Sequence, residues 1–151
     1  KKVVPHVIAE PSLGVERAFL VFMFDAYSYE KERENVVLRL HPKLAPVKVG
    51  VFSLVAKLDK EAKEIFDSLK SDFSCIFDRS GSIGRRYARA DESGIPYCIT
   101  LDFESSVDKC ITIRNRDDAK QVRAKIADLK ETIRKLVNNE MKFEETGKIV
   151  K

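Results

Sequence analysis

The sequence predicts an α/β fold in which a small, mixed and mostly parallel β-sheet is flanked by helices. Short segments rich in β-branched and apolar residues, typical of buried strands, alternate with amphipathic segments of helical period. Strands separated by helices are expected to pair in parallel, whereas the short polar connection between the third and fourth strands predicts one antiparallel pair. The predicted order is β-α-β-α-β-β-α, preceded by a strand and a buried helix from another domain.

The first elements form an N-terminal part of their own. Residues 3–10 are expected to be extended, and Ser12 is a candidate cap for a helix over 13–29. From Ala18 to Phe24 this helix is apolar on every side, so it must be buried on every side. We expect a missing portion of a larger parent protein to pack there; the alternative is a deep core helix within this domain.

A boundary is predicted soon after this helix. The charged break at 31–35 precedes a strand candidate at 36–40, and the segment 41–46 contains two prolines that are typical of a linker. We therefore divide the chain into a remnant of a first domain, a linker, a second domain and a tail without strong pattern. Their ranges are 1–40, 41–46, 47–139 and 140–151.

The second domain begins with a strand and ends with the clearest helix of the chain. Asp59 is expected to cap the first helix, and the last helix carries one apolar stripe from Val122 to Leu136. This stripe is too short for a coiled-coil seam and favours a helix laid on a sheet. The strands are predicted at 47–55, 73–77, 97–103 and 110–116, with a helix from Ile83 between the second and third.

Composition narrows the possible functions. The 151 residues are 44% hydrophobic and 34% charged, with a net charge of +4, which permits nucleic-acid binding without demanding it. The longest apolar run is far shorter than the roughly 20 residues that cross a bilayer, so no membrane association is expected. Three cysteines without C-x-x-C spacing favour buried free thiols, a reducing compartment and hence a cytoplasmic location.

Catalytic motifs are missing from 47–151. The two histidines, His6 and His41, precede this range, and no metal-binding motif occurs. Gly81 and Gly84 form a G-S-I-G turn that allows backbone amides to approach a phosphate, but this spacing alone is a weak signal.

The helix from Ile83 has its charges at unfavourable ends. Arginines occupy its first turn and acidic residues its last, although the helix dipole favours the reverse by roughly 0.3–1 kcal/mol for each charge. We expect the arginines to point outward to a ligand; the alternative is that they bridge to carboxylates such as Asp102. The residues concerned are Arg85, Arg86, Arg89, Asp91 and Glu92.

A second polar cluster ends the fourth predicted strand. Arg114, Asn115 and Arg116 could read base edges or hold phosphates. The alternative is a solvated loop in which Asp117 or Asp118 caps the last helix. The residues alone thus indicate an α/β module that binds RNA or another anion.

Longer stretches resemble a known enzyme family. PHVIAEPSLGVER resembles motif 3 of class II aminoacyl-tRNA synthetases, in the form found in glycyl-tRNA synthetases of the archaeal and eukaryotic type. SGSIGRRYARADESGIPYCITLDF and ITIRNRD look like the C-terminal anticodon-binding domain of that family, and LHPKLAPVKVGVF looks like its linker and first strand. The resemblance covers the chain from Pro5 to about Val137.

The resemblance implies a homodimeric ligase that joins glycine to tRNA-Gly with ATP and Mg²⁺. Arg17 matches the catalytic arginine that holds the ATP phosphates, and Glu10 and Ser12 match residues of the glycine pocket. Ala9 departs from the family pattern V-I-E-P-S and puts the register before Glu10 in question. Because the chain begins at motif 3, we expect it to bind tRNA without aminoacylating it, and we expect the rest of the catalytic domain to pack on the 13–29 helix.

The resemblance also implies how the second domain works. Its sheet and edge loops would read an anticodon whose second and third bases are cytosine, without a cofactor, a metal or DNA. Arg114 and Arg116 match positions that approach the anticodon, with Asn115 between them. Arg85, Arg86, Arg89, Asp91 and Glu92 would be contacts or supports. The alternatives are a non-catalytic accessory subunit with the same fold and a small-molecule phosphate binder.

Overall fold

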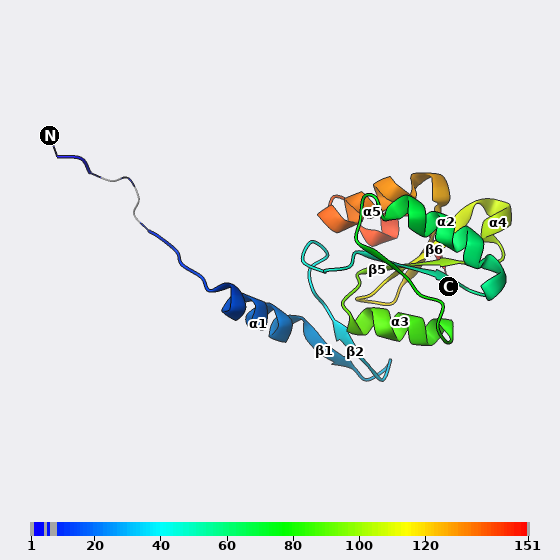
Figure 1. Ribbon diagram of the computed structural model, residues 1–151, viewed down its shortest axis with the longest axis horizontal. Coiled ribbons are helices and arrows are strands. Elements are labelled where there is room, and N and C mark those ends of the chain that lie inside the picture. Colours follow the sequence, from blue (N-terminus) through cyan, green and yellow to red (C-terminus); the bar gives the residue numbers. More distant parts are fainter. Residues whose placement is uncertain (1, 5, 7–8, 151) are drawn as a thin grey trace.

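The fold is built on one central sheet (Figure 1). The computed structural model describes residues 2–4, 6 and 9–150. In this part of the chain a six-stranded sheet has the order β4-β3-β5-β6-β7-β8. Its strands are β3 (Val49–Ser53), β4 (Cys75–Phe77), β5 (Tyr97–Leu101), β6 (Cys110–Asn115), β7 (Gln121–Lys125) and β8 (Lys148–Val150).

Helices cover both faces of the sheet, as predicted for an α/β fold. Helices α2 (Asp59–Leu69) and α5 (Leu129–Asn138) lie on one face, and α3 (Ile83–Glu92) lies on the other (Figure 1). The larger core cluster includes Val51, Ile99 and Leu136, whereas Phe52, Ala90, Ile95 and Cys98 form a smaller cluster under α3. The remaining short helical segments are η1 (Ala56–Leu58), α4 (Ser105–Asp108), η2 (Ile126–Asp128) and η3 (Phe143–Glu145).

The sheet is mixed, but the prediction that it is mostly parallel is wrong. β3 pairs in parallel with β4 and β5, while β5–β6, β6–β7 and β7–β8 are antiparallel. Antiparallel pairs therefore outnumber parallel pairs in the described residues. The difference arises because β7 and β8 were not predicted, and both extend the sheet on its antiparallel side.

The segment 121–125 is a strand, although the apolar stripe predicted a helix from Val122. Val122 and Ala124 are buried, whereas Lys125 is exposed, which is the two-residue alternation of a strand. Its backbone pairs with β6, with Val122 opposite Ile113. The helix α5 begins only at Leu129, so the spacing of four between Val122 and Ile126 was a coincidence of sequence.

The tail after residue 139 is also ordered. Phe143 is buried and its ring stacks on Tyr97, with 6.4 Å between the ring centroids. β8 pairs with β7 at the sheet edge. A Cβ atom on Gly147 would lie 2.1 Å from the carbonyl oxygen of Arg123, so only glycine allows this approach.

The N-terminal helix is shorter than predicted. Helix α1 (Val15–Ala26) begins after Gly14 without a side-chain cap, so Ser12 is not its cap. It ends where β1 (Tyr27–Glu30) begins, and β1 pairs with β2 (Asn35–Leu38) as an antiparallel hairpin. Of the strand predicted at 3–10, positions 5, 7 and 8 lie outside the described residues, and the others are in no helix or strand.

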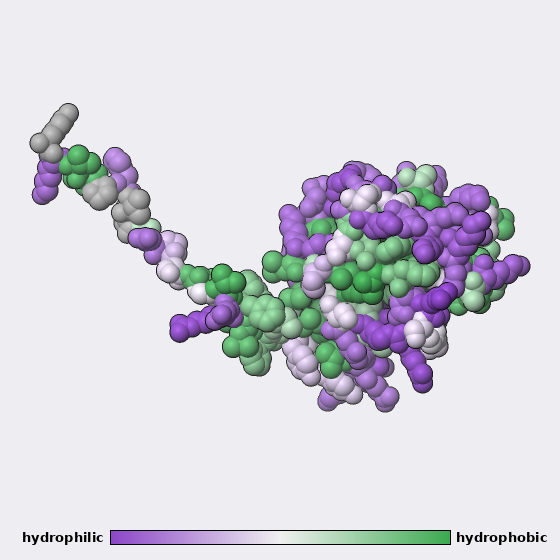
Figure 2. Space-filling view, in the orientation of Figure 1, coloured by the Kyte–Doolittle hydropathy of each residue, from purple (hydrophilic) through white to green (hydrophobic). Residues whose placement is uncertain are grey.

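Helix α1 extends away from the sheet and exposes apolar side chains. Figure 2 shows hydrophobic residues gathered along this segment. Val15 is 84% exposed and Phe24 is 74% exposed. Burial of this face by the rest of a parent protein stays a prediction. Within the described residues, no helix combines the length and apolarity needed to cross a membrane.

Candidate nucleic-acid interface

Helix α3 divides the predicted site residues into two groups. Its N-terminus follows the carboxyl end of β4, and it runs back to the amino end of β5. At 1.5 Å per residue, Arg85 and Asp91 are separated by about 9 Å along the helix. The structure therefore does not bring all the predicted residues together: Arg85, Arg86 and Arg89 lie toward the carboxyl edge of the parallel strands, and Asp91, Glu92 and residues 114–116 toward the opposite edge.

The start of α3 is held by the glycine turn. Gly81 has a φ of +74°, which favours glycine, and the Ser82 hydroxyl accepts a hydrogen bond from the Arg85 N–H at 3.4 Å. Apart from Gly84 itself, its chain neighbours and the adjacent helix backbone, no described atom lies within 4 Å of where a Cβ of Gly84 would be. Arg85 is exposed and makes no ion pair within the described residues. The first turn of α3 thus presents a cation and free backbone amides to solvent.

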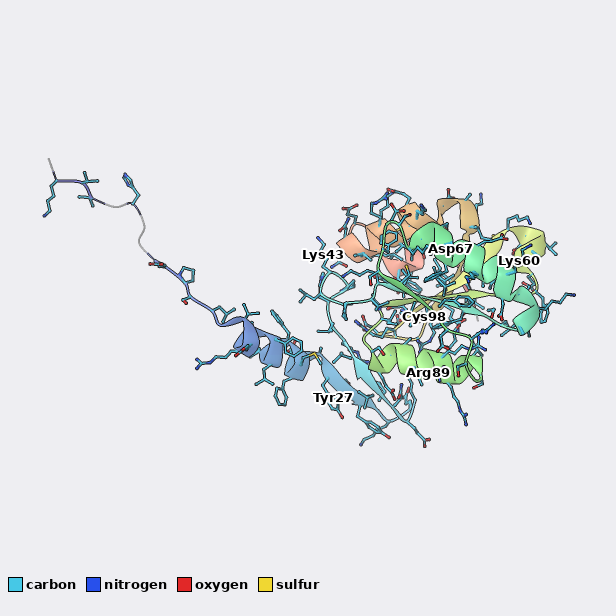
Figure 3. All side chains as sticks on the ribbon, in the orientation of Figure 1. Tyr27, Lys43, Lys60, Asp67, Arg89 and Cys98 are labelled. Carbon is cyan, nitrogen blue, oxygen red and sulfur yellow. The ribbon has the colours of Figure 1, made fainter. Side chains whose placement is uncertain are left out.

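Arg89 lies on the exposed side of α3, where Figure 3 labels it. Its guanidinium group donates to the Asp78 carboxylate at 2.5 and 3.1 Å and to the carbonyl oxygen of Ser80 at 2.6 Å. Partial burial tends to raise the pKa of Asp78, but hydrogen bonds from the Ser80 N–H and Arg89 hold it below its ordinary value. Arg89 therefore anchors the loop after β4 while part of its side chain remains exposed.

Arg86 differs from its neighbours because it is buried. It is 7% exposed and donates to the carbonyl oxygens of Ser53 at 2.5 Å and Gly81 at 2.8 Å. Its Nε has no hydrogen-bond partner in the described part of the chain. The expectation that all three arginines point outward is wrong for Arg86, because helical geometry places it against the end of β3.

Asp91 and Arg114 form a buried ion pair at the other end of α3. The two guanidinium nitrogens of Arg114 donate to the Asp91 carboxylate at 2.7 and 2.9 Å, and both side chains are less than a tenth exposed. The same guanidinium group lies 4.7 Å from the ring centroid of Tyr87, whose hydroxyl bonds Thr100 at 2.7 Å. Burial alone would lower the pKa of Arg114, but the hydrogen bonds with Asp91 raise it above its ordinary value.

Arg116 is also enclosed by protein, at 1% exposed. It donates to the carbonyl oxygens of Gly94 and Leu40, each at 2.8 Å, and to the Asp117 carboxylate at 2.8 Å. The Asn115 side chain accepts from the Asp117 N–H at 3.2 Å, and Glu92 is exposed. The alternative in which Asp117 or Asp118 caps the last helix is wrong, because a strand follows this turn and α5 begins at Leu129.

Arg123 lies near the carboxyl edge of the parallel strands, where it pairs with Asp102, and the sequence did not identify it as a site residue. Its guanidinium group donates to Asp102 at 2.6 and 3.1 Å and to Asp108 at 2.7 and 3.1 Å. Burial raises the pKa of Asp102, but hydrogen bonds from Arg123 and Ser105 lower it overall. Asp102 therefore bridges to Arg123 and not to the arginines of α3. The apolar stripe predicts a helix over this segment, so sequence reasoning does not place Arg123 in the sheet; the alternation in QVRAK is the available signal.

The carboxyl edge of the parallel strands gathers groups suited to RNA. β4, β3 and β5 are neighbours, so the residues that follow them lie along one edge. Phe103, two residues after the end of β5, is 59% exposed. In complexes with single-stranded RNA, unpaired bases stack on exposed aromatic rings of the protein, and the phosphates pair with its arginines. The charged members of this edge include Asp59, Asp78, Arg79, Arg85, Arg89, Asp102, Glu104, Asp108 and Arg123.

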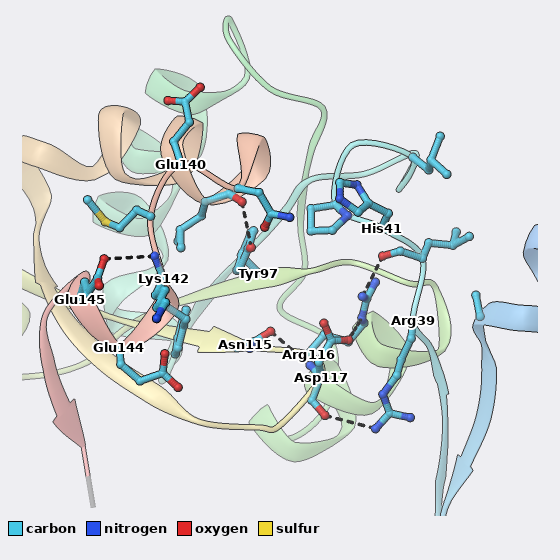
Figure 4. A pocket seen from close by; sticks show the side chains of 18 of the residues that line it. Arg39, His41, Tyr97, Asn115, Arg116, Asp117, Glu140, Lys142, Glu144 and Glu145 are labelled. Carbon is cyan, nitrogen blue, oxygen red and sulfur yellow. Dashed lines mark hydrogen bonds and ion pairs between the residues drawn. The ribbon is translucent and has the colours of Figure 1, made fainter.

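A cleft of about 980 Å³ lies at the opposite edge (Figure 4). It is bordered by residues 39–42, Leu44, Tyr97, 115–117, Leu136 and 139–145 together with the end of α1. Its polar lining mixes both signs of charge, including Arg39, Asp117 and Lys142 (Figure 4). Of the predicted contacts, only Asn115 and Arg116 line it, and the guanidinium group of Arg116 is already bonded within the protein.

The residues matched to the catalytic site do not form an enclosed pocket in this chain. Glu10, Ser12 and Arg17 are all exposed, at or before the first turns of α1. They do not line the cavities of about 980, 530 and 410 Å³ in the described part of the chain. Nor do the described residues contain a group of three or more His, Cys, Asp or Glu side chains able to hold a metal ion. The residues present therefore do not by themselves fit ATP and Mg²⁺.

The cysteines are free in the described residues. Cys98 is buried between α3 and the sheet (Figure 3), and Cys75 is half-buried. Burial raises the pKa of the Cys98 thiol to about 12 and that of Cys75 to about 11. Neither thiol is suited to act as a nucleophile at neutral pH.

Known proteins resemble this chain along most of its length. The chain is 50% identical over 132 residues to the glycine–tRNA ligase of Acetivibrio thermocellus, covering 85% of this chain and 28% of that protein. The glycine–tRNA ligase of Malacoplasma penetrans is 52% identical over 132 residues, with the same shares covered, and that of Caldanaerobacter subterraneus is 48% identical over 145 residues, 95% of this chain and 30% of that protein. The chain thus spans less than a third of the length of these relatives.

A solved structure supports the fold. Histidyl-tRNA synthetase from Nostoc sp. PCC 7120 superposes with a TM-score of 0.57 at 21% identity, covering 60% of this chain and 22% of that chain. The family described as Anticodon binding domain matches residues 46–136. The mixed sheet with helices on both faces and the predicted resemblance to such a domain are thereby confirmed. Because the match runs from before β3 to Leu136 within α5 and includes more than half of the sequence, the chain belongs to the Anticodon binding domain family.

Proposed function

We propose that this chain is the tRNA-binding, anticodon-recognising part of a glycine–tRNA ligase. The observation that carries the proposal is the carboxyl edge of β4, β3 and β5, where exposed arginines, an exposed aromatic ring and the first turn of α3 occur together. Ligands of open α/β sheets commonly bind at this edge. Membership of the Anticodon binding domain family and the names of the ligase relatives support RNA as the ligand.

The charged groups at this edge have complementary tasks in the proposal. Arg85 is free to pair with a backbone phosphate, and the exposed ring of Phe103 offers a stacking surface for an unpaired base. Asp102 is held in its ionised form by Arg123 and can accept a hydrogen bond from the amino group of a cytosine. Glu104 is exposed next to Phe103 and can act in the same way.

The buried arginines take a different part. Arg86 ties the start of α3 to the end of β3, and Arg114 and Arg116 tie its far end to β6 and to the chain before residue 41. In this proposal they keep α3 in place and thereby position the exposed edge. Asp91 belongs with them through its pair with Arg114, whereas Asn115 and Glu92 remain accessible for secondary contacts.

The remaining features of the parent enzyme are also proposals. ATP and Mg²⁺ would be bound by the full-length ligase, with Arg17 at the ATP phosphates and Glu10 and Ser12 at glycine, once the rest of the catalytic domain packs on α1. Homodimerisation and a cytoplasmic location complete this picture, and the archaeal and eukaryotic type stays a prediction. The fragment alone is expected to form no glycyl-adenylate, and measurable formation by it would contradict this.

Filter binding with tRNA-Gly tests the proposal. We expect salt-sensitive binding that weakens when the anticodon cytosines are changed. Arg85→Ala should weaken binding about 5- to 30-fold, as loss of one charged contact does, while Arg134→Ala, an exposed arginine on α5, serves as the matched control. Equal binding of tRNAs with and without the cytosines would show that the domain does not read the anticodon.

A further inference from the structure

The β1–β2 hairpin packs closely against the far end of α3 (Figure 1). Val37 at its centre is completely buried. Gly94, just after α3, has a φ of +73°, and a Cβ atom there would lie 3.1 Å from the carbonyl oxygen of Leu38. The hairpin backbone and the turn after α3 are thus in direct contact, which leaves no room for an independent position of the hairpin.

Arg33 in the hairpin turn and Arg39, the residue after β2, bind the turn between β6 and β7. Arg33 donates to the carbonyl oxygens of Arg116 at 2.7 Å and Asp117 at 3.2 Å, and it lies 3.5 Å from the Asp91 carboxylate. Arg39 donates to the same carbonyl of Asp117 at 3.2 Å. The hairpin therefore supplies cations to carbonyl oxygens that β6 and β7 leave unpaired at their connection.

Two further bonds join residues 35–40 to the domain. Asn35 of β2 donates to the carbonyl oxygen of Ala88 within α3 at 3.1 Å, and in the reverse direction the almost fully buried Arg116 donates to the carbonyl oxygen of Leu40 at 2.8 Å. Each of these bonds joins residues more than 50 positions apart in the sequence. Together with the bonds from the two arginines they form a reciprocal clamp.

The segment 41–46, predicted as a linker, is a closed turn. The Lys48 ammonium group donates to the carbonyl oxygens of Pro42, Lys43 and Ala45 at 2.7–2.8 Å. Ala45 is 1% exposed, and its N–H bonds the carbonyl oxygen of His41 at 3.1 Å. Three carbonyls converging on one cation hold this segment in a single conformation.

Helix α1 has no comparable attachment. Of its residues only Ala26 is buried, and Val15 and Phe24 are largely exposed. A short helix that lacks tertiary packing is marginally stable in water. The attachment of the chain to the domain thus begins at Ala26, whose carbonyl oxygen accepts from the Arg39 N–H at 2.6 Å.

We propose that residues 27–46 form one cooperative folding unit with residues 47–150, so that the joint with the α1 segment lies at Ala26–Tyr27 and not at 41–46. One consequence rests on the proposed function: α3 then connects the carboxyl edge of β4, β3 and β5, where RNA would bind, rigidly to the hairpin. The orientation of that edge relative to the rest of a parent enzyme is then set at Ala26–Tyr27, where α1 joins the hairpin.

Hydrogen exchange of the full chain without RNA tests the unit directly, so its outcome does not depend on the proposed function. The protection factors of amides in the β1–β2 ladder should lie within about tenfold of those in β5, because members of one cooperative unit open together. Amides of α1 should be at least about 100-fold less protected. Hairpin amides that exchange as fast as those of α1 would overturn the proposal.

The variant Arg33→Ala provides a second measurement. Loss of the hydrogen bonds from Arg33 should lower the protection of amides against hydrogen exchange about tenfold or more. The factor should be the same in the hairpin and in β5. Lys48→Met should act in the same way by freeing the 41–46 turn, and Arg134→Ala on α5 should change neither region. Loss confined to the hairpin, or no loss in either region, would show that the clamp does not join the two parts.

Discussion

Replacing Asp91 by alanine should destabilise the domain strongly. The change leaves the guanidinium group of Arg114 buried at 6% exposure without its carboxylate partner. Removing one partner of a buried ion pair costs about 3–5 kcal/mol, whereas exposed pairs contribute little. A domain of this size has a free energy of unfolding of about 5–15 kcal/mol, so about a fifth of it or more would be lost.

Urea denaturation followed by far-UV circular dichroism measures this effect. The midpoint for Asp91→Ala should fall well below that of the wild type, and the control Lys130→Ala, which removes an exposed partner of Asp72, should leave it unchanged. The double variant Asp91→Leu with Arg114→Met should regain much of the lost stability, because neither charge is then buried. A loss below about 1 kcal/mol for Asp91→Ala would refute the reasoning, since the pair would then behave like a surface pair.

Three further predictions concern the carboxyl edge and the core. Phe103→Ala should weaken tRNA binding about 5- to 100-fold in filter assays with an unchanged urea midpoint, because the exposed ring contributes base stacking and little packing; a shifted midpoint would point to a structural role. The pKa of Asp102 is lowered on folding, so the stability it provides is present above its ordinary pKa near 4 and is lost as pH falls through the folded value. In thermal melts between pH 6 and 2, the melting temperature of Arg123→Ala should therefore fall less steeply with pH than that of the wild type. Identical slopes of melting temperature against pH would contradict this. Cys98, with a pKa of about 12, should react with a thiol reagent at pH 8 only on unfolding, and rapid native-state labelling would disprove its burial.

Much of the fold was predictable from local patterns. Strands at Val49–Ser53, Tyr97–Leu101 and Cys110–Asn115 follow β-branched segments, and α3 follows its glycine turn and serine cap. The short strand β7 was not predictable in the same way. Val122 also fits the helical stripe that continues to Leu136, and pairing with β6 decides in favour of the strand. β8 depends similarly on β7, since an edge strand of three residues has little pattern of its own.

The candidate site, like the fold, was only partly predictable from the sequence. The sequence by itself determined the order of most strands and helices, the reversed charges of α3 and the kinship to anticodon-binding domains. It could not tell Arg85, which is exposed, from Arg86 and Arg114, which are buried. Periodicity assigns a side chain to a face of its own element, but only the tertiary structure decides whether another element covers that face. In this protein β3, the glycine turn and α3 surround those arginines, and the carbonyl oxygens of Ser53 and Gly81 and the carboxylate of Asp91 accept their hydrogen bonds.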